Sequence, residues 1–352
     1  MKKILYTATV LSHLQLFHQP FMQMMKEHGY QVDAASDTKP FANKELACDH
    51  SYDVCFPRNP FSFQTFKAYR QIKKIIKDND YDIIHCNSPT AGILTRLAAR
   101  HSKAKVIYMA HGFHFFKGAP LLNWLLFYPA EKFASYFTDD LITINNEDYQ
   151  RAKKHFAAKH LHLIPGVGLD TSKFANPQRL YIDKTEIHLL SVGELNKNKN
   201  HEIVIQALAH CPHNIHYHIC GQGPLQERLT NLAKELNVNL HLEGFQTNVK
   251  PFLDQADIFI FPSLREGLPK SVMEAMANGL PCIVSDIRGN HDLIDQDGGY
   301  VVANEITEYI AAIKSLASSA YLRQQQGLHN KEAIKKYDIQ NILPLMEDIY
   351  LK

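Results

Sequence analysis

Short apolar runs alternate with helix-length segments along most of this chain. The runs are roughly four to eight residues long, rich in Ile, Val and Leu, and lack regular polar alternation, which is typical of strands covered on both faces. Five fall in each half: KILYTATV, YQVDAAS, YDIIHCN, KVIYMAHG and DLITIN, then IHLLSVGEL, IHYHICG, NLHLEGF, DIFIFPS and PCIVSD. Strands that alternate with helices build parallel sheets with right-handed crossovers. The pattern therefore predicts two doubly wound α/β domains of five strands each.

The predicted domain boundary is the segment 167–186, which contains proline and glycine and loses helical periodicity. We expect an N-terminal domain over 1–166 and a C-terminal domain over 187–335, with 167–186 as the hinge. Residues 336–352 are predicted to be terminal helices that pack back toward the N-terminal domain, with Pro344 as a break or first-turn residue. Two such domains would face each other across a cleft and bind ligands beyond the carboxyl ends of their strands.

The composition excludes several classes of protein. The formal net charge of the 352-residue chain is only +2, so we predict no nucleic acid partner. None of the six cysteines forms a CxxC pair, which indicates free thiols in a reducing compartment. The start, MKKILYTATVLS, is better explained as a buried strand than as a signal peptide, and no apolar run is long enough to span a bilayer. We therefore expect a cytoplasmic protein.

The segment REGLPKSVMEAMANGLP places two carboxylates around the start of a short helix. Glu266 follows the apolar run ADIFIFPS, in a loop with a glycine and a proline. Ser271 is expected at the N-cap or in the first turn, with Glu274 three positions later as in a capping box, and Gly279 at the C-cap. Such a helix start offers backbone N–H groups to an anion, and Lys270 adds a positive charge. Simple capping and solvation would explain the same residues about equally well.

This segment resembles the E-x7-E motif of the family 4 retaining glycosyltransferases, which have the GT-B fold. The resemblance covers nearly the whole chain, and the blocks FHQP, GELNKNKNH and REGLPKSVMEAMA are similar to bacterial transferases of capsule and exopolysaccharide operons. It implies two Rossmann-like domains facing across a cleft, the first binding the acceptor and the second the nucleotide sugar. Four further segments match the family's landmarks in order: Pro165–Asp170 with Phe174, Ser191–Leu195 with Lys199–His201, Gly221–Pro224, and Leu242–Phe245.

The resemblance also implies a donor site in the second domain. Glu274 would accept hydrogen bonds from the ribose hydroxyls, Glu266 would meet hydroxyls of the donor sugar, and Lys199 would neutralise the diphosphate. Backbone N–H groups near Ser271 and Val272 would cradle that diphosphate. The implied catalytic residues are His111, Glu266 and Lys199. The implied donor-binding residues are Gly193, Glu194, Lys199, Gly244, Phe245, Glu266, Gly267, Leu268, Lys270, Ser271, Val272 and Glu274.

Glu194 departs from the family pattern, because many relatives carry an arginine at this position. A carboxylate there would repel a diphosphate unless it points away or binds a hydroxyl or a lysine. The sequence leaves three replacements for the missing positive charge open: Lys197, Arg265 and Lys270.

The first domain contributes histidines. His111 follows the apolar run KVIYMA, at a place where relatives carry a histidine that faces the donor sugar; the alternative is a structural histidine at a strand end. Ser12 and His13, after the first strand, are expected on the acceptor side, whereas His18 is expected to pack in the core. His111 and His114 have an H-x2-H spacing, but no third ligand lies at a diagnostic distance in the sequence.

We therefore predict no metal site and no cofactor, the nucleotide sugar being a substrate. The two D-x-D sequences, at Asp80–Asp82 and Asp295–Asp297, are interpreted as turns.

Two segments of the first domain suggest a membrane surface. Residues 64–77 form a basic amphipathic pattern that could rest on anionic lipid, although a crossover helix with a solvated basic face would have the same pattern. Residues 113–137 are apolar but are broken by Gly118, Pro120 and Pro129, so they form either core or an apolar lip for a lipid-linked acceptor.

The sequence thus predicts a retaining hexosyltransferase-type glycosyltransferase that is peripheral at the cytoplasmic face of the plasma membrane. It would move a hexose or N-acetylhexosamine from a UDP-linked donor to a lipid-linked oligosaccharide in capsule or exopolysaccharide synthesis. Two alternatives remain: a nucleotide-sugar epimerase of the same fold, and a non-catalytic nucleotide-sugar-binding subunit.

Overall fold

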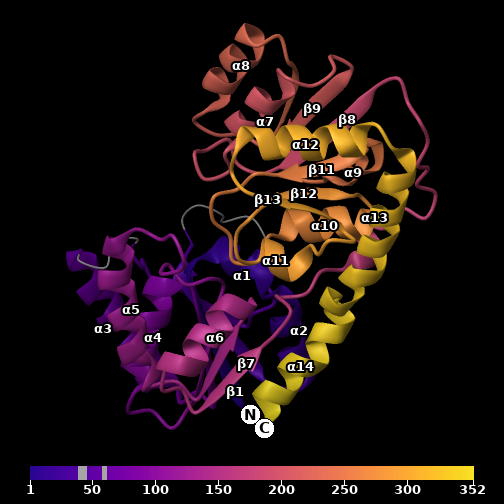
Figure 1. The fold of residues 1–352 in the computed structure, drawn as a ribbon. Coiled ribbons are helices and arrows are strands. Elements are labelled where there is room, and N and C mark those ends of the chain that lie inside the picture. Colours follow the sequence, from indigo (N-terminus) through magenta and orange to yellow (C-terminus); the bar gives the residue numbers. More distant parts are fainter. Residues whose placement is uncertain (39–45, 58–61) are drawn as a thin grey trace. The chain divides into compact units, whose positions relative to one another are not determined.

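The computed structural model describes residues 1–38, 46–57 and 62–352 (Figure 1). The chain divides into two compact units, each with its own parallel sheet. Unit 1 comprises Met1–Gly168 and Gln340–Lys352, and unit 2 comprises Leu169–Ile339. The predicted N-terminal domain ended at residue 166, and the predicted C-terminal domain began at residue 187. The last helix, α14 (Ile339–Leu351), packs within unit 1, where the Tyr350 hydroxyl lies 2.6 Å from Nδ1 of His85.

Unit 1 is built on a seven-stranded parallel sheet of order β3-β2-β1-β4-β5-β6-β7. Adjacent side chains along β1 and β4 are buried on both faces, as the apolar runs require. Its strands are β1 (Lys3–Val10), β2 (Gln31–Asp37), β3 (His50–Asp53), β4 (Ile83–Asn87), β5 (Lys105–Ala110), β6 (Asp140–Thr143) and β7 (His160–Leu163). Besides α14, its helices are α1 (Leu11–Phe17), α2 (Gln19–Glu27), α3 (Phe63–Asn79), α4 (Pro89–Ala99), α5 (Leu121–Ser135) and α6 (Asn146–His155).

Unit 2 repeats the arrangement with six parallel strands of order β10-β9-β8-β11-β12-β13. Leu189 and Leu190, neighbours in β8, belong to separate buried clusters, so helices cover both faces of the sheet. The strands are β8 (Ile187–Val192), β9 (Ile215–Cys220), β10 (Asn239–Gly244), β11 (Ile258–Phe261), β12 (Cys282–Ser285) and β13 (Gly299–Val302). The helices are α7 (His201–Leu208), α8 (Gln226–Glu235), α9 (Lys250–Gln255), α10 (Lys270–Asn278), α11 (Asn290–Leu293), α12 (Ile306–Ala317) and α13 (Ala320–Ala333), with short 3-10 turns at Thr171–Lys173 and Ile334–Tyr337.

The prediction of two doubly wound α/β units is confirmed, but the count of five strands in each is wrong. The sequence pattern missed β3, β7 and β13, which all lie at sheet edges. An edge strand has one strand neighbour and often an exposed face, so it needs no continuous apolar run. Accordingly β3 (HSYD) and β7 (HLHL) are polar and mostly exposed or half-buried, and β13 (GYVV) starts with a glycine directly after a turn.

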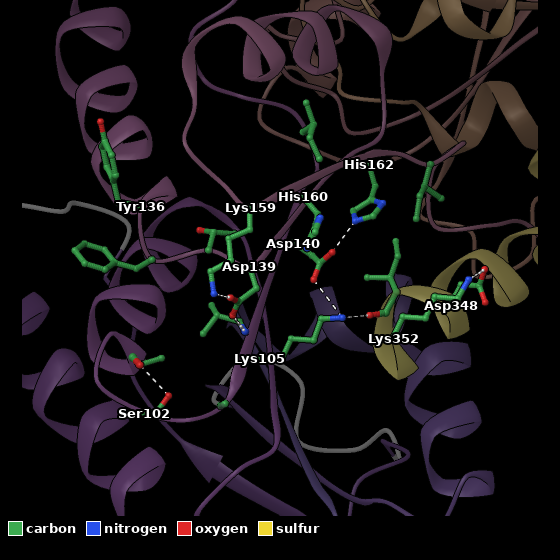
Figure 2. Close-up of a pocket in the computed structure, with 18 of the residues that line it drawn as sticks. Ser102, Lys105, Tyr136, Asp139, Asp140, Lys159, His160, His162, Asp348 and Lys352 are labelled. Atoms are coloured by element: carbon green, nitrogen blue, oxygen red, sulfur yellow. Dashed lines mark hydrogen bonds and ion pairs between the residues drawn. The ribbon is translucent and has the colours of Figure 1, made fainter.

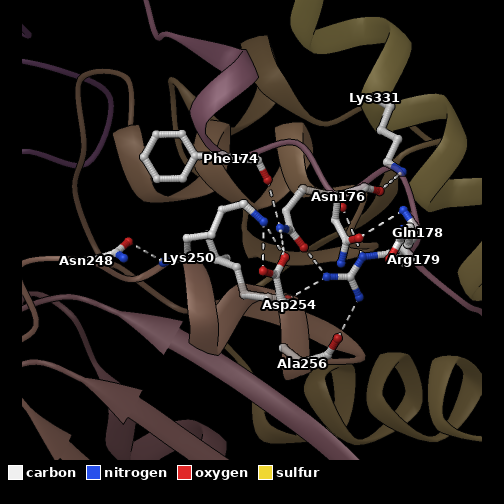
Figure 3. A network of polar contacts seen from close by, with 11 residues as sticks. Phe174, Asn176, Gln178, Arg179, Asn248, Lys250, Asp254, Ala256 and Lys331 are labelled. Carbon is white, nitrogen blue, oxygen red and sulfur yellow. Dashed lines mark hydrogen bonds and ion pairs between the residues drawn. The ribbon is translucent and has the colours of Figure 1, made fainter.

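The segment that leads into the sheet of unit 2 is held by Arg179, whose guanidinium donates to three backbone carbonyls (Figure 3). Its nitrogens donate to Asn278 at 3.0 Å, Ala256 at 2.7 Å and Leu253 at 2.5 Å. The Asn278 side chain in turn donates to Asp254 and to the carbonyl of Phe174. Asn278 is the last residue of α10, so this network fixes the carboxyl end of that helix.

The basic amphipathic segment is a helix, α3, capped by the Ser62 side chain. The six cysteines are free, as expected. Pro344 does not break the terminal helix, because α14 continues through it and buries Ile342 and Met346 on either side. That burial offsets the missing backbone hydrogen bond. In the part of the chain that the structure describes, no helix is long and apolar enough to cross a bilayer.

Candidate active site

The site in unit 2 forms where the strand order reverses, between β8 and β11. In open parallel sheets the loops at such a switch point diverge to opposite faces and leave room for a ligand. Here the loops that follow β8 and β11 are joined by hydrogen bonds. The Leu264 N–H donates to the Asn198 carbonyl at 2.7 Å, and the Asn198 amide donates to the Arg265 carbonyl at 3.1 Å.

Lys199 and Glu266 are brought together by this pairing of loops. The Lys199 ammonium lies 2.6 Å from Oε1 of Glu266, which also accepts a hydrogen bond of 2.6 Å from the Ser263 hydroxyl. The ammonium also lies 4.7 Å from the ring centre of Phe261. Both charged side chains are about one-fifth exposed, so solvent reaches the pair. Lys199 can therefore exchange its carboxylate partner, Glu266, for an anionic group of a ligand.

The glycines of neighbouring loops allow close backbone approach at the same edge. A Cβ on Gly221 would lie 1.9 Å from the Gly193 carbonyl oxygen, and the Gly221 N–H donates to the Gly244 carbonyl. A Cβ on Gly193 would lie 3.2 Å from the Lys199 side chain. The three loops after β8, β9 and β10 therefore meet beside Lys199, and the next residue, Phe245, is exposed. A residue larger than glycine at position 193 or 221 would push these loops apart.

Helix α10 presents its amino end to this edge, but not as a capping box. The N-cap is Pro269, and no side-chain cap bond is found there within the described structure. Ser271 thus lies in the first turn, and the N-cap alternative is wrong because the fixed backbone of Pro269 already supplies the entry into the helix. Val272 is fully buried, so it can offer a ligand only its backbone. Gly279 is the C-cap as predicted, with φ of 86°.

Glu274 is the buried acid of the site, 8% exposed. The Lys270 ammonium lies 3.8 Å from its Oε1, one helical turn away. Desolvation by burial raises the pKa of Glu274 to about 7, although Lys270 opposes the shift. A carboxylate with so little solvation gains strongly from hydroxyl donors.

Glu194 and the loop residues Gly267 and Leu268 occupy the rim of the site. The Glu194 side chain is exposed and accepts a hydrogen bond of 2.9 Å from the Asn196 amide. Gly267 and Leu268 are half-buried, and Leu268 packs on the apolar cluster beneath α10. Lys197 and Arg265 are both exposed.

Sequence reasoning missed Arg288, which follows β12. It is 8% exposed, and its Nε donates to the backbone carbonyl of Glu266 at 3.1 Å. The next residue, Gly289, has φ of 79°, and a Cβ there would lie 2.2 Å from the Gly267 carbonyl. Arg288 and Gly289 thus position the loop that carries Glu266. The signal was present, since SDIRGN directly follows an apolar run, as the other site loops do.

In unit 1 the described strand ends after β1 and β5 carry histidines. His13 lies in α1, directly after β1, and His111 directly follows β5. The ring centres of these two histidines are 4.4 Å apart, with their planes at 83°. His18 is fully buried, as predicted, but it also contacts the site, with Nε2 3.1 Å from Nε2 of His111. Ser12 is half-buried beside them in sequence.

Burial keeps these imidazoles neutral. It lowers the pKa of His13 to about 4 and holds the pKa values of His18 and His111 well below their usual value, with the neighbouring histidines adding to both shifts. No metal site was predicted from the spacing of His111 and His114. The structure instead places one nitrogen from each of His13, His18 and His111 within 4.8 Å of the others, while the His114 ring packs on Phe127.

The two D-x-D sequences are turns, as interpreted. Asp80 is the left-handed C-cap of α3, and the Asp295 carboxylate accepts hydrogen bonds from the Asp297 and Gly298 N–H groups.

A large cavity of about 1220 Å³ lies elsewhere in unit 1, around the amino ends of β5, β6 and β7 (Figure 2). Lys105 reaches both Asp140 and the Ile349 carbonyl there, and Lys159 pairs with Asp139. None of the predicted site residues lines this cavity. We place the candidate site at the carboxyl ends of the strands, since open α/β sheets bind their ligands at that edge.

Comparisons with known proteins identify the family. Residues 172–333 match the family described as "Glycosyl transferases group 1", and residues 3–145 match "Glycosyl transferase 4-like". A Bacillus subtilis protein with the name "Putative glycosyltransferase EpsD" is 35% identical over 99% of this chain and 96% of its own length. The chain belongs to the family 4 glycosyltransferases. It is an enzyme of the hexosyltransferase type.

Other relatives of this glycosyltransferase include a UDP-Gal:α-D-GlcNAc-diphosphoundecaprenol α-1,3-galactosyltransferase of Escherichia coli. It is 29% identical over 84% of this chain and 81% of its own length.

Solved structures share the fold at low sequence identity. Sucrose-phosphate synthase from Thermosynechococcus elongatus superposes with a TM-score of 0.84 at 17% identity, covering 99% of this chain and 98% of that one. Anabaena HepE, in complex with UDP and glucose, gives 0.81 at 15% identity and covers 99% of both chains. The predicted GT-B fold class of the glycosyltransferase is thereby confirmed.

Proposed function

We propose that unit 2 binds a UDP-linked sugar at the switch point between β8 and β11. The observation that carries this proposal is the Lys199–Glu266 pair at 2.6 Å, exposed to solvent and placed beside the amino end of α10. A diphosphate would take over the Lys199 ammonium and receive N–H groups from the first turn of α10 near Ser271 and Val272. Glu266, released from the lysine, would then accept from hydroxyls of the donor sugar.

The nucleoside would be recognised by Glu274. Its poorly solvated carboxylate would gain two hydrogen bonds from the ribose hydroxyls, which would also restore its usual charged state. Glycines 193 and 244 would allow close approach, with Phe245, Gly267 and Leu268 around the ligand. The rim carboxylate of Glu194 would point away toward Asn196, and Lys197, Arg265, Lys270 and the buried Arg288 are the basic residues left to compensate.

The proposed reaction moves a hexose or N-acetylhexosamine with retention of anomeric configuration. The acceptor hydroxyl oxygen would bond to the anomeric carbon, the bond from that carbon to the UDP oxygen would break, and the acceptor proton would pass to the departing diphosphate. Lys199 stabilises the charge that develops on the diphosphate, and we assign His111 a contact with the transferred sugar. Ser12 and His13 are assigned to the acceptor side. This mechanism requires no metal and no cofactor.

The proposed acceptor is a lipid-linked oligosaccharide of capsule or exopolysaccharide synthesis. Support comes from the relatives, since the Escherichia coli enzyme is named for a diphosphoundecaprenol-linked acceptor and a Campylobacter jejuni relative, 29% identical over 43% of this chain, carries a diphospho-undecaprenol acceptor in its name.

The first test is a thermal-shift screen with nucleotide sugars, because a ligand that binds only the folded state raises the melting temperature. We expect UDP-hexoses to raise it, and transfer to a lipid-linked acceptor to give a product with the donor's anomeric configuration by NMR. Turnover of the donor to an epimer in the absence of any acceptor would favour the epimerase alternative and contradict the proposal.

Unit 1 is proposed to attach the cytoplasmic enzyme to the inner leaflet. Helix α3 exposes Phe63 almost completely and Phe66 largely, beside exposed Lys67, Arg70, Lys73, Lys74 and Lys77. Helix α5 exposes Leu121, Leu122 and Leu125, and both helices contact α4. Apolar side chains next to basic ones suit an anionic membrane surface.

Flotation with vesicles tests this attachment. We expect the protein to float with vesicles that contain anionic lipid and to stay behind with neutral ones. Reversing the charge at Lys73 and Lys74 should abolish flotation, whereas reversing it at Lys234, exposed on α8, should not. A wild-type protein that never floats would exclude the attachment and leave the proposed transfer untouched.

A further inference from the structure

We propose that His13, His18 and His111 form a binding site for a zinc-type divalent transition-metal ion in unit 1. One ring nitrogen of each lies within 4.8 Å of the other two. Zinc bonds to histidine nitrogens at about 2.0–2.1 Å in tetrahedral geometry, which holds neighbouring nitrogens about 3.4 Å apart. Nε2 of His18 and Nε2 of His111 are already 3.1 Å apart. The remaining separations are at most 4.8 Å, so they exceed the zinc spacing by no more than about 1.4 Å, a difference that side-chain rotation can close.

Unpaired ring nitrogens support a ligand at this place. Among the described residues, Nε2 of His13 and Nδ1 of His18 are buried without a hydrogen-bond partner, as is Nε2 of the adjoining His85. A neutral imidazole offers one donor and one acceptor, so the His18–His111 contact satisfies only one nitrogen of His18. Buried polar atoms in native proteins normally have partners, and a group of unpaired ones indicates a water or an ion. An ion bound by the three rings would give His13 its missing partner.

The surroundings hold the three rings in place. His18 ends α1 and precedes α2, so it is fixed between two helices, and His111 is fixed by the end of β5. The rings of His13 and His18 meet that of His111 nearly edge-on, at 83° and 84°. The Phe17 ring packs on both His13 and His111. Preorganised ligands lose little entropy on binding, which favours affinity.

The donor set selects the kind of ion. Imidazole nitrogen suits zinc, copper, nickel and iron, whereas magnesium and calcium require oxygen ligands. Three histidines around zinc leave a fourth position for water or for a ligand atom.

Metal binding would oppose transfer, and this consequence depends on the function proposed above. His111 is assigned a contact with the transferred sugar, and an ion would occupy its Nε2. The mechanism proposed above uses no metal, so we expect zinc to inhibit the enzyme and a chelator to restore its activity. Binding of the ion itself does not depend on the assigned function.

The experiment is a titration of the chelator-treated full-length protein with Co2+, followed by the visible absorption of tetrahedral cobalt and by thermal shift. We expect the protein to bind one equivalent of Co2+ tightly. Zn2+ should displace this Co2+, and Mg2+ should not. His13→Ala and His18→Ala should each weaken that equivalent by about tenfold or more. His13 is half-buried, so its variant tests the site even if the variant of fully buried His18 is poorly folded.

His241→Ala is the matched control, because unit 2 has its own group of imidazoles. His188 and His218 lie 3.1 Å apart there, and His216 and His241 lie 3.2 Å apart, on one face of β8, β9 and β10. The tight equivalent should survive in this variant. Its loss in His241→Ala, its persistence in His13→Ala, or the absence of tight binding in the wild type would overturn the inference.

Transfer assays separate this inference from the proposed function. If Co2+ and Zn2+ bind as described but saturating Zn2+ leaves transfer unchanged, the metal site stands and the role assigned to His111 fails. If His111→Ala abolishes transfer but the wild type binds no Co2+ tightly, the assigned role stands and the metal site fails.

Discussion

The two units share a strand order but differ in the chemistry at the carboxyl ends of their strands. When the strands of each unit are numbered along the chain, the first six lie in the order 3-2-1-4-5-6 in both sheets. At these ends unit 2 carries charged pairs, Lys199 with Glu266 and Lys270 with Glu274. Unit 1 carries neutral histidines packed against one another and against aromatic rings. The topology therefore determines where a ligand can bind, and the loop residues determine which ligand.

The difference has a physical basis in solvation. Lys199 and Glu266 each stay about one-fifth exposed, so a charged pair persists there at modest cost. His18 is fully buried, and a charge at that depth would be expensive, which is why its pKa falls and the ring remains neutral. We therefore propose an anion such as a diphosphate as the ligand of unit 2, and neutral hydroxyls or a metal ion as the ligand of unit 1.

The largest effect is expected from Lys199→Ala. Transfer should fall by about a thousandfold, because the diphosphate loses the cation that stabilises its developing charge. The affinity for UDP, measured by calorimetry, should fall with it. Lys234→Ala, which removes an exposed cation from α8, should change neither. Transfer within threefold of the wild type in Lys199→Ala would mean that unit 2 does not hold the donor diphosphate.

His111→Ala should lower transfer by about a hundredfold, the lower range for a positioned histidine in catalysis. Its affinity for UDP should stay within about twofold of the wild type, since the nucleotide is assigned to unit 2. This split between turnover and binding separates the two units experimentally. His114→Ala is the control and should retain transfer. A loss of UDP binding in His111→Ala would contradict the assignment of the nucleotide to unit 2 and of His111 to turnover alone.

Arg179→Ala should lower the free energy of unfolding by about 2 kcal/mol, because three backbone carbonyls and the side-chain oxygen of Asn278 lose a charged donor. Amide hydrogen exchange should locate the loss in unit 2, around α10, and leave unit 1 protected. The control is Arg228→Ala, which breaks an exposed pair with Glu202 and should cost little. Equal loss of protection in both units would show that Arg179 is not a local anchor.

The smallest predicted effect is a pH dependence of stability due to Glu274. Its pKa is about 7 in the folded protein against a usual value of 4.5, so the folded state binds more protons between these values and its stability declines as the pH rises through this range. Glu274→Gln removes the ionisation. Without ligand, this variant should be more stable than the wild type at pH 8, by at most about 3 kcal/mol.

Urea unfolding at pH 8 and pH 4.5 measures this effect, and the difference between the two proteins should vanish at the lower pH. At the same time Glu274→Gln should weaken UDP binding, since an amide accepts hydroxyl hydrogen bonds less strongly than a carboxylate. A constant difference across the pH range would show that Glu274 is not the titrating group.

The sequence alone determined the repeating β and α elements and the segments that carry Lys199, Glu266 and Glu274. Buried central strands must be continuously apolar and helices must be periodic, so both leave local patterns, and a motif with fixed spacing marks one loop and one helix start. Edge strands such as β3 and β7 leave no such pattern, because half of their surface needs no apolar cover.

Only the tertiary structure decided which loops meet. Residues 199 and 266 become partners because β8 and β11 are neighbours in the sheet, and no local pattern encodes that pairing. The same holds for Arg288 beneath the Glu266 loop, and for His13 and His18 against His111. Sequence periodicity reflects the burial of side chains along a single element. A site is instead formed by contacts between elements, and those contacts depend on the order in which the strands pair.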